Sequence, residues 1–286
     1  MAKDVQYFAP TTLEETLQLL GKHGESIHVL AGGTDLVRDM NLGYASPKSI
    51  VWIGHLKLEY IKEEQGVIRI GAATRMQTAG ASDLLWKKAT ALAQAAAKLA
   101  SPPVRSLATL GGNICTASPA ADTVCAMLGL GAEVVLVSLK GERVVPLHEF
   151  FTGPGETVRR PDELLTEIRI VPTSEREGSA YEKVGRRAAL TLAVLNAASR
   201  VKLDGKGNCE SAIIAVGAAA PTPLRIFRAE EALKGKPFTE EAIAQAAQIA
   251  SEDIRPIDDV HGTAWYRRKL TKVLVSRTLR AAGGLQ

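Results

Sequence analysis

Two pairs of adjacent glycines, each preceded by apolar residues, constrain this chain most. Gly32-Gly33 follows the apolar run Val29–Ala31, which is typical of a strand, and Gly111-Gly112 follows Thr109-Leu110. A backbone without Cβ atoms can turn sharply and offer successive N–H groups to an anion. A single pair of this kind is also consistent with an ordinary tight turn that binds no ligand. Together they favour one extended polar ligand, with a pyrophosphate suited to the first loop.

The residues after the second pair are polar and begin a helix. Ser118 is expected as its N-cap and Pro119 as its first helical residue, which places Asp122 in or near the first turn. An aspartate there can simply complement the helix dipole. Its closeness in sequence to Thr109 and Asn113 favours a role in binding the same ligand.

Other signatures of nucleotide binding or covalent catalysis fail. Gly129-x-Gly131 and Gly153-x-Gly155 lack the third glycine of the dinucleotide fingerprint, and no P-loop occurs. There is no G-x-S-x-G motif for a nucleophilic serine. We therefore expect neither a Rossmann site nor a covalent hydrolase, and we assign no side chain as a catalytic acid or base.

Metal-binding patterns are also missing from the sequence. Cys115, Cys125 and Cys209 show no metal-ligand spacing, and three thiolates cannot hold a four-cysteine iron–sulfur cluster. His148-Glu149 starts like a zinc-protease helix, but Thr152 occupies the position of the second histidine. No metal site is expected in this chain.

Length and charge narrow the class of protein. With 286 residues the chain is long enough for two or three units, and its 35 basic and 31 acidic residues give a net charge of +4. The positive charge is spread along the chain, which argues against nucleic acid as a partner. No apolar stretch approaches the roughly 20 residues of a membrane span. We expect a cytoplasmic protein without a membrane span and without a nucleic-acid partner.

Composition and periodicity divide the chain into three units. Residues 1–56 form a small α/β unit, with a Thr12/Glu15 capping box and expected strands at Ile27–Ala31 and Ile50–Ile53. Residues 57–175 form an α+β unit around an alanine-rich helix expected from Trp86 to Ala100. After a polar segment, residues 178–286 begin with a hairpin turning at residues 204–208 and end in three helices.

At the glycine loops the sequence resembles a known family. VLAGGTDL (29–36) and TLGGNICTASPAAD (109–122) are similar to the two flavin-binding loops of the FAD-binding medium subunits of molybdenum hydroxylases. This is the xanthine dehydrogenase, nicotinate dehydrogenase and carbon monoxide dehydrogenase family. Further similar segments are 7–20, 68–75, 101–113 and 160–172, with YEKVGRR (181–187) and YRRKLTKVLVSRTL (266–279) in the last unit.

The resemblance implies an α+β fold: a two-part FAD-binding module of the vanillyl-alcohol-oxidase type, followed by a C-terminal flavoprotein domain of β-sheet and helices. FAD should lie between the first two units. The residues expected at the pyrophosphate are Val29, Leu30, Ala31, Gly32, Gly33, Thr34, Asp35 and Leu36. Those expected at the rest of the cofactor are Thr109, Gly111, Gly112, Asn113, Ser118 and Asp122, with Ser101, Leu165 and Lys183 approaching it.

One of these residues has a direct physical rationale. The Lys183 ammonium can stabilise negative charge on a reduced flavin ring. The alternative is a solvated strand lysine. Two departures from the family also matter: the chain lacks the cysteine-rich insertion that holds a four-iron cluster in some relatives, and Thr191 stands where many relatives have an aspartate.

The implied function is electron transfer inside a complex. A large molybdopterin-binding subunit oxidises the substrate, two [2Fe-2S] clusters in a small subunit carry the electrons, and FAD in this chain passes them to an external acceptor. A dimer of heterotrimers is expected. The alternatives are a self-contained flavin-dependent reductase or oxidase, and a non-catalytic scaffold with degenerate loops, which the intact glycine pairs disfavour.

The C-terminal segment suggests a docking helix. Between Thr263 and Gln286 lie six basic residues, no acidic residue, and an apolar stripe of Trp265, Leu270, Val273 and Leu274. The alternative is a final helix packed on its own unit with a solvated basic face.

Overall fold

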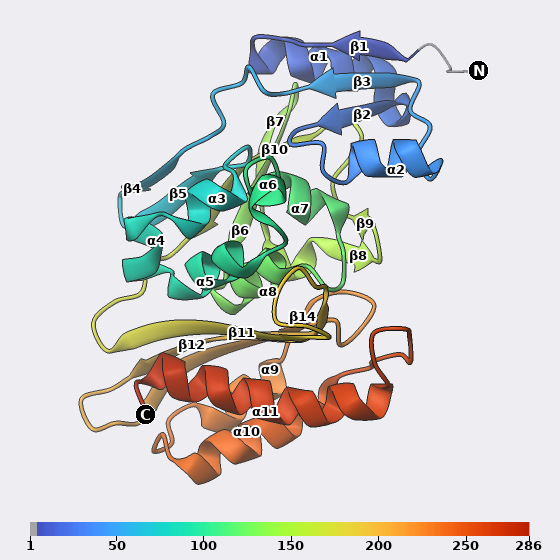
Figure 1. Cartoon of the computed structure of the whole chain (residues 1–286). Coiled ribbons are helices and arrows are strands. Elements are labelled where there is room, and N and C mark those ends of the chain that lie inside the picture. The colour runs from blue at the N-terminus through green and yellow to red at the C-terminus, as the bar shows by residue number, and fades with distance from the viewer. Residues whose placement is uncertain (1–4, 286) are drawn as a thin grey trace.

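The computed structural model describes residues 5–285. Three sheet-containing layers follow one another in chain order from the top to the bottom of Figure 1, and helices separate the second sheet from the third. The architecture is α+β, as the sequence predicts.

The first sheet is parallel. Its strand order is β1 (Gln6–Phe8), β3 (Ser49–Trp52), β2 (Ile27–Leu30). The helices of this part are α1 (Leu13–His23) and α2 (Leu36–Leu42), with a 3-10 turn at Gly24–Ser26. The predicted capping box is present, because the Thr12 hydroxyl accepts from Glu15 N at 3.2 Å and the Glu15 carboxylate accepts from Thr12 N at 3.3 Å. Helix α1 passes through Gly21 and ends at Gly24.

The second sheet is antiparallel and carries a layer of helices on one face (Figure 1). Its order is β4 (Ile61–Glu64), β5 (Val67–Gly71), β10 (Leu164–Ile170), β6 (Glu133–Ser138), β7 (Gly141–Pro146). The helices are α3 (Met76–Gly80), α4 (Asp83–Lys88), α5 (Thr90–Lys98), α6 (Pro102–Arg105), α7 (Leu110–Thr116) and α8 (Asp122–Gly129). A 3-10 turn (Leu147–Glu149) leads to a small hairpin of β8 (Phe151–Gly153) and β9 (Glu156–Thr157).

The single helix expected from Trp86 to Ala100 is wrong. The chain forms α4 and α5, separated by Ala89 at φ −151° and ψ 48°. Nothing in the alanine-rich composition signals a break, since alanine is the best helix former. The break lets α5 bury its alanine face against α3, α8 and the third sheet.

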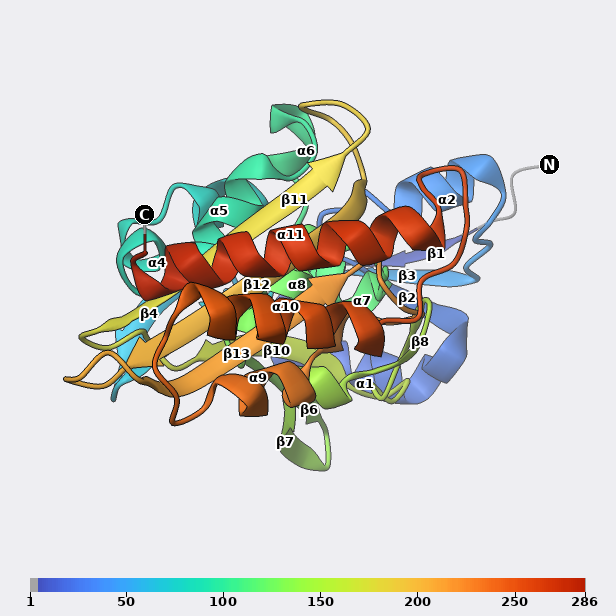
Figure 2. The same cartoon turned by 90° about the horizontal axis from the view of Figure 1, so that it is seen from below.

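The third sheet lies between two layers of helices. Its antiparallel order is β11 (Glu177–Gly185), β12 (Ala193–Leu203), β13 (Cys209–Gly217), β14 (Leu224–Arg225), and the remaining helices are α9 (Phe227–Leu233), α10 (Glu240–Asp253) and α11 (Ala264–Gly283). Helices α5 and α8 contact one face, and α11 contacts the other, running alongside α10 as Figure 2 shows. The predicted β12–β13 hairpin is confirmed, and the Asp204 carboxylate closes its turn by accepting from Lys206 N and Asn208 N, each at 2.8 Å.

A buried arginine joins the second sheet to the third. Arg200 on β12 is 8% exposed and donates to the carbonyl oxygens of Val171 at 2.7 Å and Pro172 at 3.1 Å. It also donates to Leu130 O at 3.3 Å and to the Glu177 carboxylate at 2.6 Å. The segment that connects the two sheets is therefore held to the face of the third sheet.

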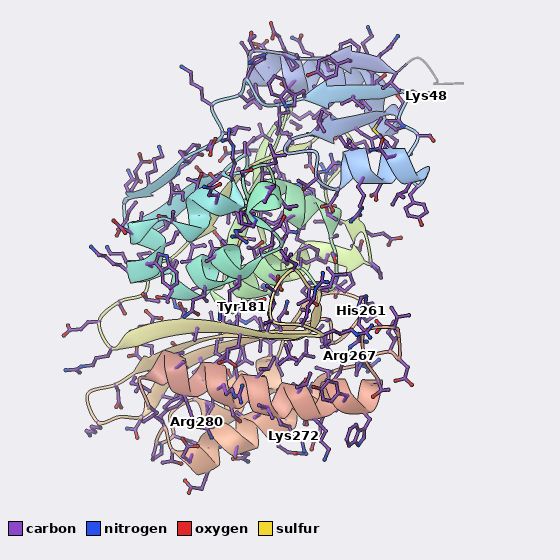
Figure 3. The ribbon with its side chains drawn as sticks, in the orientation of Figure 1. Lys48, Tyr181, His261, Arg267, Lys272 and Arg280 are labelled. Atoms are coloured by element: carbon purple, nitrogen blue, oxygen red, sulfur yellow. The ribbon has the colours of Figure 1, made fainter. Side chains whose placement is uncertain are left out.

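Helix α11 is mostly packed on its own unit. Leu270 and Leu274 belong to the core, so the predicted apolar docking stripe is wrong for these two residues. Much of its basic charge is also engaged internally: Arg267, which is 3% exposed, binds Asp259 at 2.8 Å, and Arg280 binds Glu240 on α10. Figure 3 places Arg267 near one end of α11 and Arg280 near the other. None of the helices within residues 5–285 is long and apolar enough to cross a membrane.

Candidate functional site

The first glycine pair follows β2 and turns toward the second unit. Gly33 has φ +73°, a conformation that strains any residue with a side chain. Gly32 requires glycine for a different reason, because a Cβ there would lie less than 3.0 Å from the carbonyl oxygen of Leu107. Both glycines are thus explained by backbone geometry at the contact between the units.

The second glycine pair lies in a helix and not in the sharp turn expected from the sequence. Thr109 is the N-cap of α7, and its hydroxyl accepts from Gly112 N at 3.1 Å. Gly111 N donates to Ala72 O at 2.8 Å, and a Cβ on Gly111 would lie 2.7 Å from that oxygen. The pair therefore serves to bring the start of α7 close to the end of β5.

The two segments that carry the glycine pairs meet. The Thr116 hydroxyl, in the last turn of α7, donates to the Asp35 carboxylate at 3.0 Å across 81 positions of sequence. The same hydroxyl lies 3.0 Å from Gly112 O. The segment from Gly32 to Asp35 and helix α7 therefore form one local structure, as a shared ligand would require.

The helix start at Ser118 is wrong by three residues. Helix α8 begins at Asp122 with Ala121 as N-cap, while residues 118–121 form a turn in which Ala121 N donates to Ser118 O at 3.1 Å. The turn is held from outside, since Ala218 N in the third unit donates to Pro119 O at 2.7 Å. Tertiary contact thus replaces the expected Ser-Pro helix start, and Asp122 still lies in the first turn.

Asp122 is the centre of a buried polar cluster. Its Oδ2 accepts from Lys183 Nζ at 2.5 Å, and its Oδ1 accepts from Tyr181 OH at 2.6 Å and Asn196 Nδ2 at 3.2 Å. The Lys183 side chain is 10% exposed, so it is not the solvated strand lysine of the alternative interpretation. Figure 3 shows Tyr181 between β11 and the helices above it.

Tyr181 and Asn196 were missed at the sequence level. Tyr181 and Lys183 are two residues apart on β11, so their side chains point to the same face of the sheet. Asn196 lies opposite Lys183 in the antiparallel register. The Tyr-x-Lys spacing was a usable signal. The pairing of β11 with β12 is a long-range contact that the sequence pattern did not specify.

A cavity of about 290 Å³ adjoins the lysine. It is lined by Lys183, Val184, Gly185, Arg187, Ala188 and Thr191. The carbonyl oxygen of Thr191 accepts from Lys183 Nζ at 3.5 Å, a contact that does not use the threonine side chain. Thr191 therefore reaches the cluster through its backbone.

Three further predicted residues, Ser101, Asn113 and Leu165, lie in structural roles. Ser101 caps α6 by accepting from Val104 N at 3.4 Å, and Asn113 accepts from the Thr123 hydroxyl at 2.8 Å. Leu165 is 3% exposed, pairs with Leu136 of β6 and adjoins a register shift in β10. The hydrogen bonds of residues 5–285 connect neither Ser101 nor Leu165 to the Asp122 cluster.

Two family models match successive parts of the chain. Residues 3–174 match the family described as the FAD binding domain in molybdopterin dehydrogenase, and residues 179–282 match the CO dehydrogenase flavoprotein C-terminal domain. By class the chain is a FAD-binding subunit of a dehydrogenase. It belongs to the FAD-binding family of the molybdopterin dehydrogenases, which confirms the predicted family and fold.

Individual relatives are similar over nearly their whole length. The nicotinate dehydrogenase FAD-subunit of Eubacterium barkeri is 35% identical over 93% of this chain and 92% of its own. The carbon monoxide dehydrogenase medium chain of Hydrogenophaga pseudoflava is 34% identical over 97% and 96%. Among solved structures, a carbon monoxide dehydrogenase from the same organism, which lacks the Mo-pyranopterin moiety, has a TM-score of 0.95 at 34% identity, covering 100% of this chain and 99% of its own. Quinoline 2-oxidoreductase from Pseudomonas putida 86 has a TM-score of 0.90 at 28% identity, with the same coverage of both chains.

Proposed function

We propose that this chain binds one FAD non-covalently between its first two units and relays electrons through it. The electrons are released by substrate oxidation in a large molybdopterin-binding subunit and reach the FAD through [2Fe-2S] clusters of a small subunit. From the FAD they pass to an external acceptor. The observation that carries this proposal is the buried Lys183–Asp122 pair, together with the Thr116–Asp35 hydrogen bond that joins the two glycine-containing segments.

The donor set and the open backbone fit a flavin nucleotide. Outside its own helix backbone and chain neighbours, a Cβ on Gly112 would meet only the Thr109 hydroxyl oxygen within 4 Å, which leaves room at this position for a ligand to approach. Residues 29–36 would hold the pyrophosphate. Thr109, Gly111, Gly112, Asn113, Ser118 and Asp122 would hold the remainder, together with Ser101, Leu165 and Lys183.

The bound flavin supplies the change between one-electron and two-electron chemistry. The chain's residues bind and orient it. Lys183 brings a positive charge whose side chain is only 10% exposed, and a charge so enclosed acts more strongly than in bulk solvent. Asp122 holds this ammonium in place, and no other side chain is required to move a proton.

The proposal includes the division into units and the assembly. We assign residues 1–56 and 57–175 to the two parts of the FAD module and 178–286 to the C-terminal domain. The position of the two family matches, which end at 174 and begin at 179, supports the second boundary. We further infer a cytoplasmic dimer of heterotrimers, which light scattering of the co-expressed complex would test.

One observation favours the alternative of a self-contained flavin reductase or oxidase. The cavity of about 290 Å³ beside Lys183 approaches the size that holds a small organic substrate. Under the subunit proposal, this space serves the external acceptor.

The test uses the purified single chain. Acid precipitation should leave yellow FAD in the supernatant, and artificial dyes should be reduced, while purines, N-heterocycles, aldehydes and carbon monoxide should not be hydroxylated. Flavin retained in the pellet, or FMN in its place, contradicts non-covalent FAD. Hydroxylation by the single chain contradicts the subunit role and favours the self-contained enzyme.

A further inference from the structure

Three donors converge on one carboxylate, and all three come from the third sheet. Tyr181 and Lys183 lie on β11, Asn196 lies on β12, and Asp122 begins α8 of the second unit. Lys183 and Asn196 are direct cross-strand partners in the antiparallel register. Two donors bind Oδ1 and the ammonium binds Oδ2, so the two carboxylate oxygens have separate partners.

Asn196 is an unusual choice for its position. It is fully buried, and its Nδ2 donates to Asp122 and, at 3.4 Å, to Ala120 O. Its Oδ1 is the one buried side-chain polar atom among the described residues without a hydrogen-bond partner. An unpaired buried acceptor costs free energy that an apolar residue would avoid. We infer that this position needs an asparagine because its Nδ2 group donates to Asp122.

Tyr181 is equally enclosed. Its side chain is 1% exposed, and burial, followed by the negative charge of Asp122, raises the pKa of the phenol well above its usual value. The hydroxyl therefore keeps its proton and acts as a permanent donor to Oδ1.

We propose that Tyr181 and Asn196 are positioning residues that fix the Asp122 carboxylate in one orientation and thereby hold the Lys183 ammonium at the flavin ring. This inference rests on the proposed function. Without the two donors, the carboxylate rotates and both of its oxygens compete for Lys183. The ammonium bound to Oδ2 then moves with the carboxylate, away from the position in which it would face the flavin ring, and would stabilise the reduced flavin less well.

The experiment compares Tyr181→Phe, Asn196→Ala and Lys183→Met with the parent chain. Ser199→Ala is the matched control, because Ser199 is also buried on β12 but binds Thr278 on α11, on the other side of the sheet. We would measure FAD affinity by titrating the apoprotein, the flavin reduction equilibrium against a reference dye, and thermal unfolding of each apoprotein.

Tyr181→Phe and Asn196→Ala should each weaken FAD binding about tenfold and shift the reduction equilibrium toward oxidised flavin, as expected for losing a hydrogen bond to a charged group. Lys183→Met should shift it in the same direction. When Tyr181→Phe or Asn196→Ala is combined with Lys183→Met, it should change FAD affinity and the reduction equilibrium by less than about twofold beyond Lys183→Met alone. The effects of residues that act through one another are not additive. Asn196→Ala should leave the unfolding temperature of the apoprotein close to that of the parent, a result that a purely structural role would not give.

Effects no larger than that of Ser199→Ala, or full effects that persist in the Lys183→Met background, would overturn the positioning role. Should Tyr181→Phe fail to fold, the comparison of Asn196→Ala in the parent chain and in the Lys183→Met background decides by the same criteria. A parent chain that binds no FAD would instead overturn the proposed function, so the two failures are distinguishable.

Discussion

Gly32 and Leu107 are in direct backbone contact, although one follows a strand of the first sheet and the other precedes helix α7. A methyl group on Gly32 would lie less than 3.0 Å from the Leu107 carbonyl oxygen. The contact sets the separation of the two parts that are proposed to enclose the cofactor.

Gly32→Ala should force these two parts away from each other. We expect a loss of stability of about 1–3 kcal/mol, as for other overpacked sites, together with loss of most of the flavin. Gly21→Ala is the control, because Gly21 lies inside α1 with open space where a Cβ would stand, and the change should stabilise the helix slightly. Thermal unfolding and flavin absorbance measure both effects. Full flavin content in Gly32→Ala would contradict the site.

Gly112 and Gly111 should respond differently to valine. Gly112→Val meets the Thr109 hydroxyl alone, so we expect a folded protein that has lost most of its FAD. Gly111→Val collides with the backbone of Ala72 and should lower the unfolding temperature as well. Circular dichroism and flavin-to-protein ratios separate the two outcomes, and equal flavin in Gly112→Val and the parent would remove Gly112 from the site.

Arg200→Met should detach the connecting segment from the third sheet. The change leaves Glu177 as a buried carboxylate without its partner and removes the donor from the Val171 and Pro172 carbonyl groups. Removing one partner of a buried ion pair lowers the free energy of unfolding by about 3–5 kcal/mol. Lys202→Met on the same strand removes a solvent-exposed pair with Glu210 and should cost at most about 1 kcal/mol. Similar unfolding midpoints in denaturant for both variants would refute the clamp.

Glu167 should contribute to stability above acidic pH. Burial raises the pKa of this carboxyl, but hydrogen bonds from Arg69, Arg169 and Tyr60 outweigh burial, and the net pKa falls below the usual value of 4.5. The contribution is therefore complete above about pH 4.5 and disappears as the pH falls through the lower folded-state pKa.

Glu167→Gln should accordingly lose about 1–3 kcal/mol at pH 7 and show a smaller further loss on acidification below pH 4.5 than the parent. Glu175→Gln, in the exposed connecting segment, serves as the control. Unfolding temperatures measured from pH 7 to pH 3 test the difference. Parallel curves for Glu167→Gln and the parent would show that Glu167 does not act in this way.

Local chemistry predicted much of the fold correctly. The Thr12 cap and the turn at Asp204 depend on neighbours in sequence, and both are present. The errors occur where distant contacts decide the structure. The helix expected from the alanine-rich composition is interrupted at Ala89. Pro119 accepts a hydrogen bond from Ala218, which lies in the third unit.

The candidate site divides in the same way. The glycine pairs and Asp122 were recognisable because motifs at fixed spacing carry them. Asn196 was not, because its relation to Asp122 exists only once β12 is paired with β11 and packed on α8. The buried position of Lys183 also depends on that packing.

All eight residues of α8 are buried, and its first residue is the carboxylate on which three side chains from the third sheet converge. During synthesis, therefore, Asp122 emerges from the ribosome well before the strands that complete its surroundings. A nascent chain that ends before Asn196 has both glycine loops but lacks the full set of donors. Flavin loading in the cell should accordingly follow translation of the third sheet, and fragments that stop at the connecting segment should be poor acceptors of the cofactor.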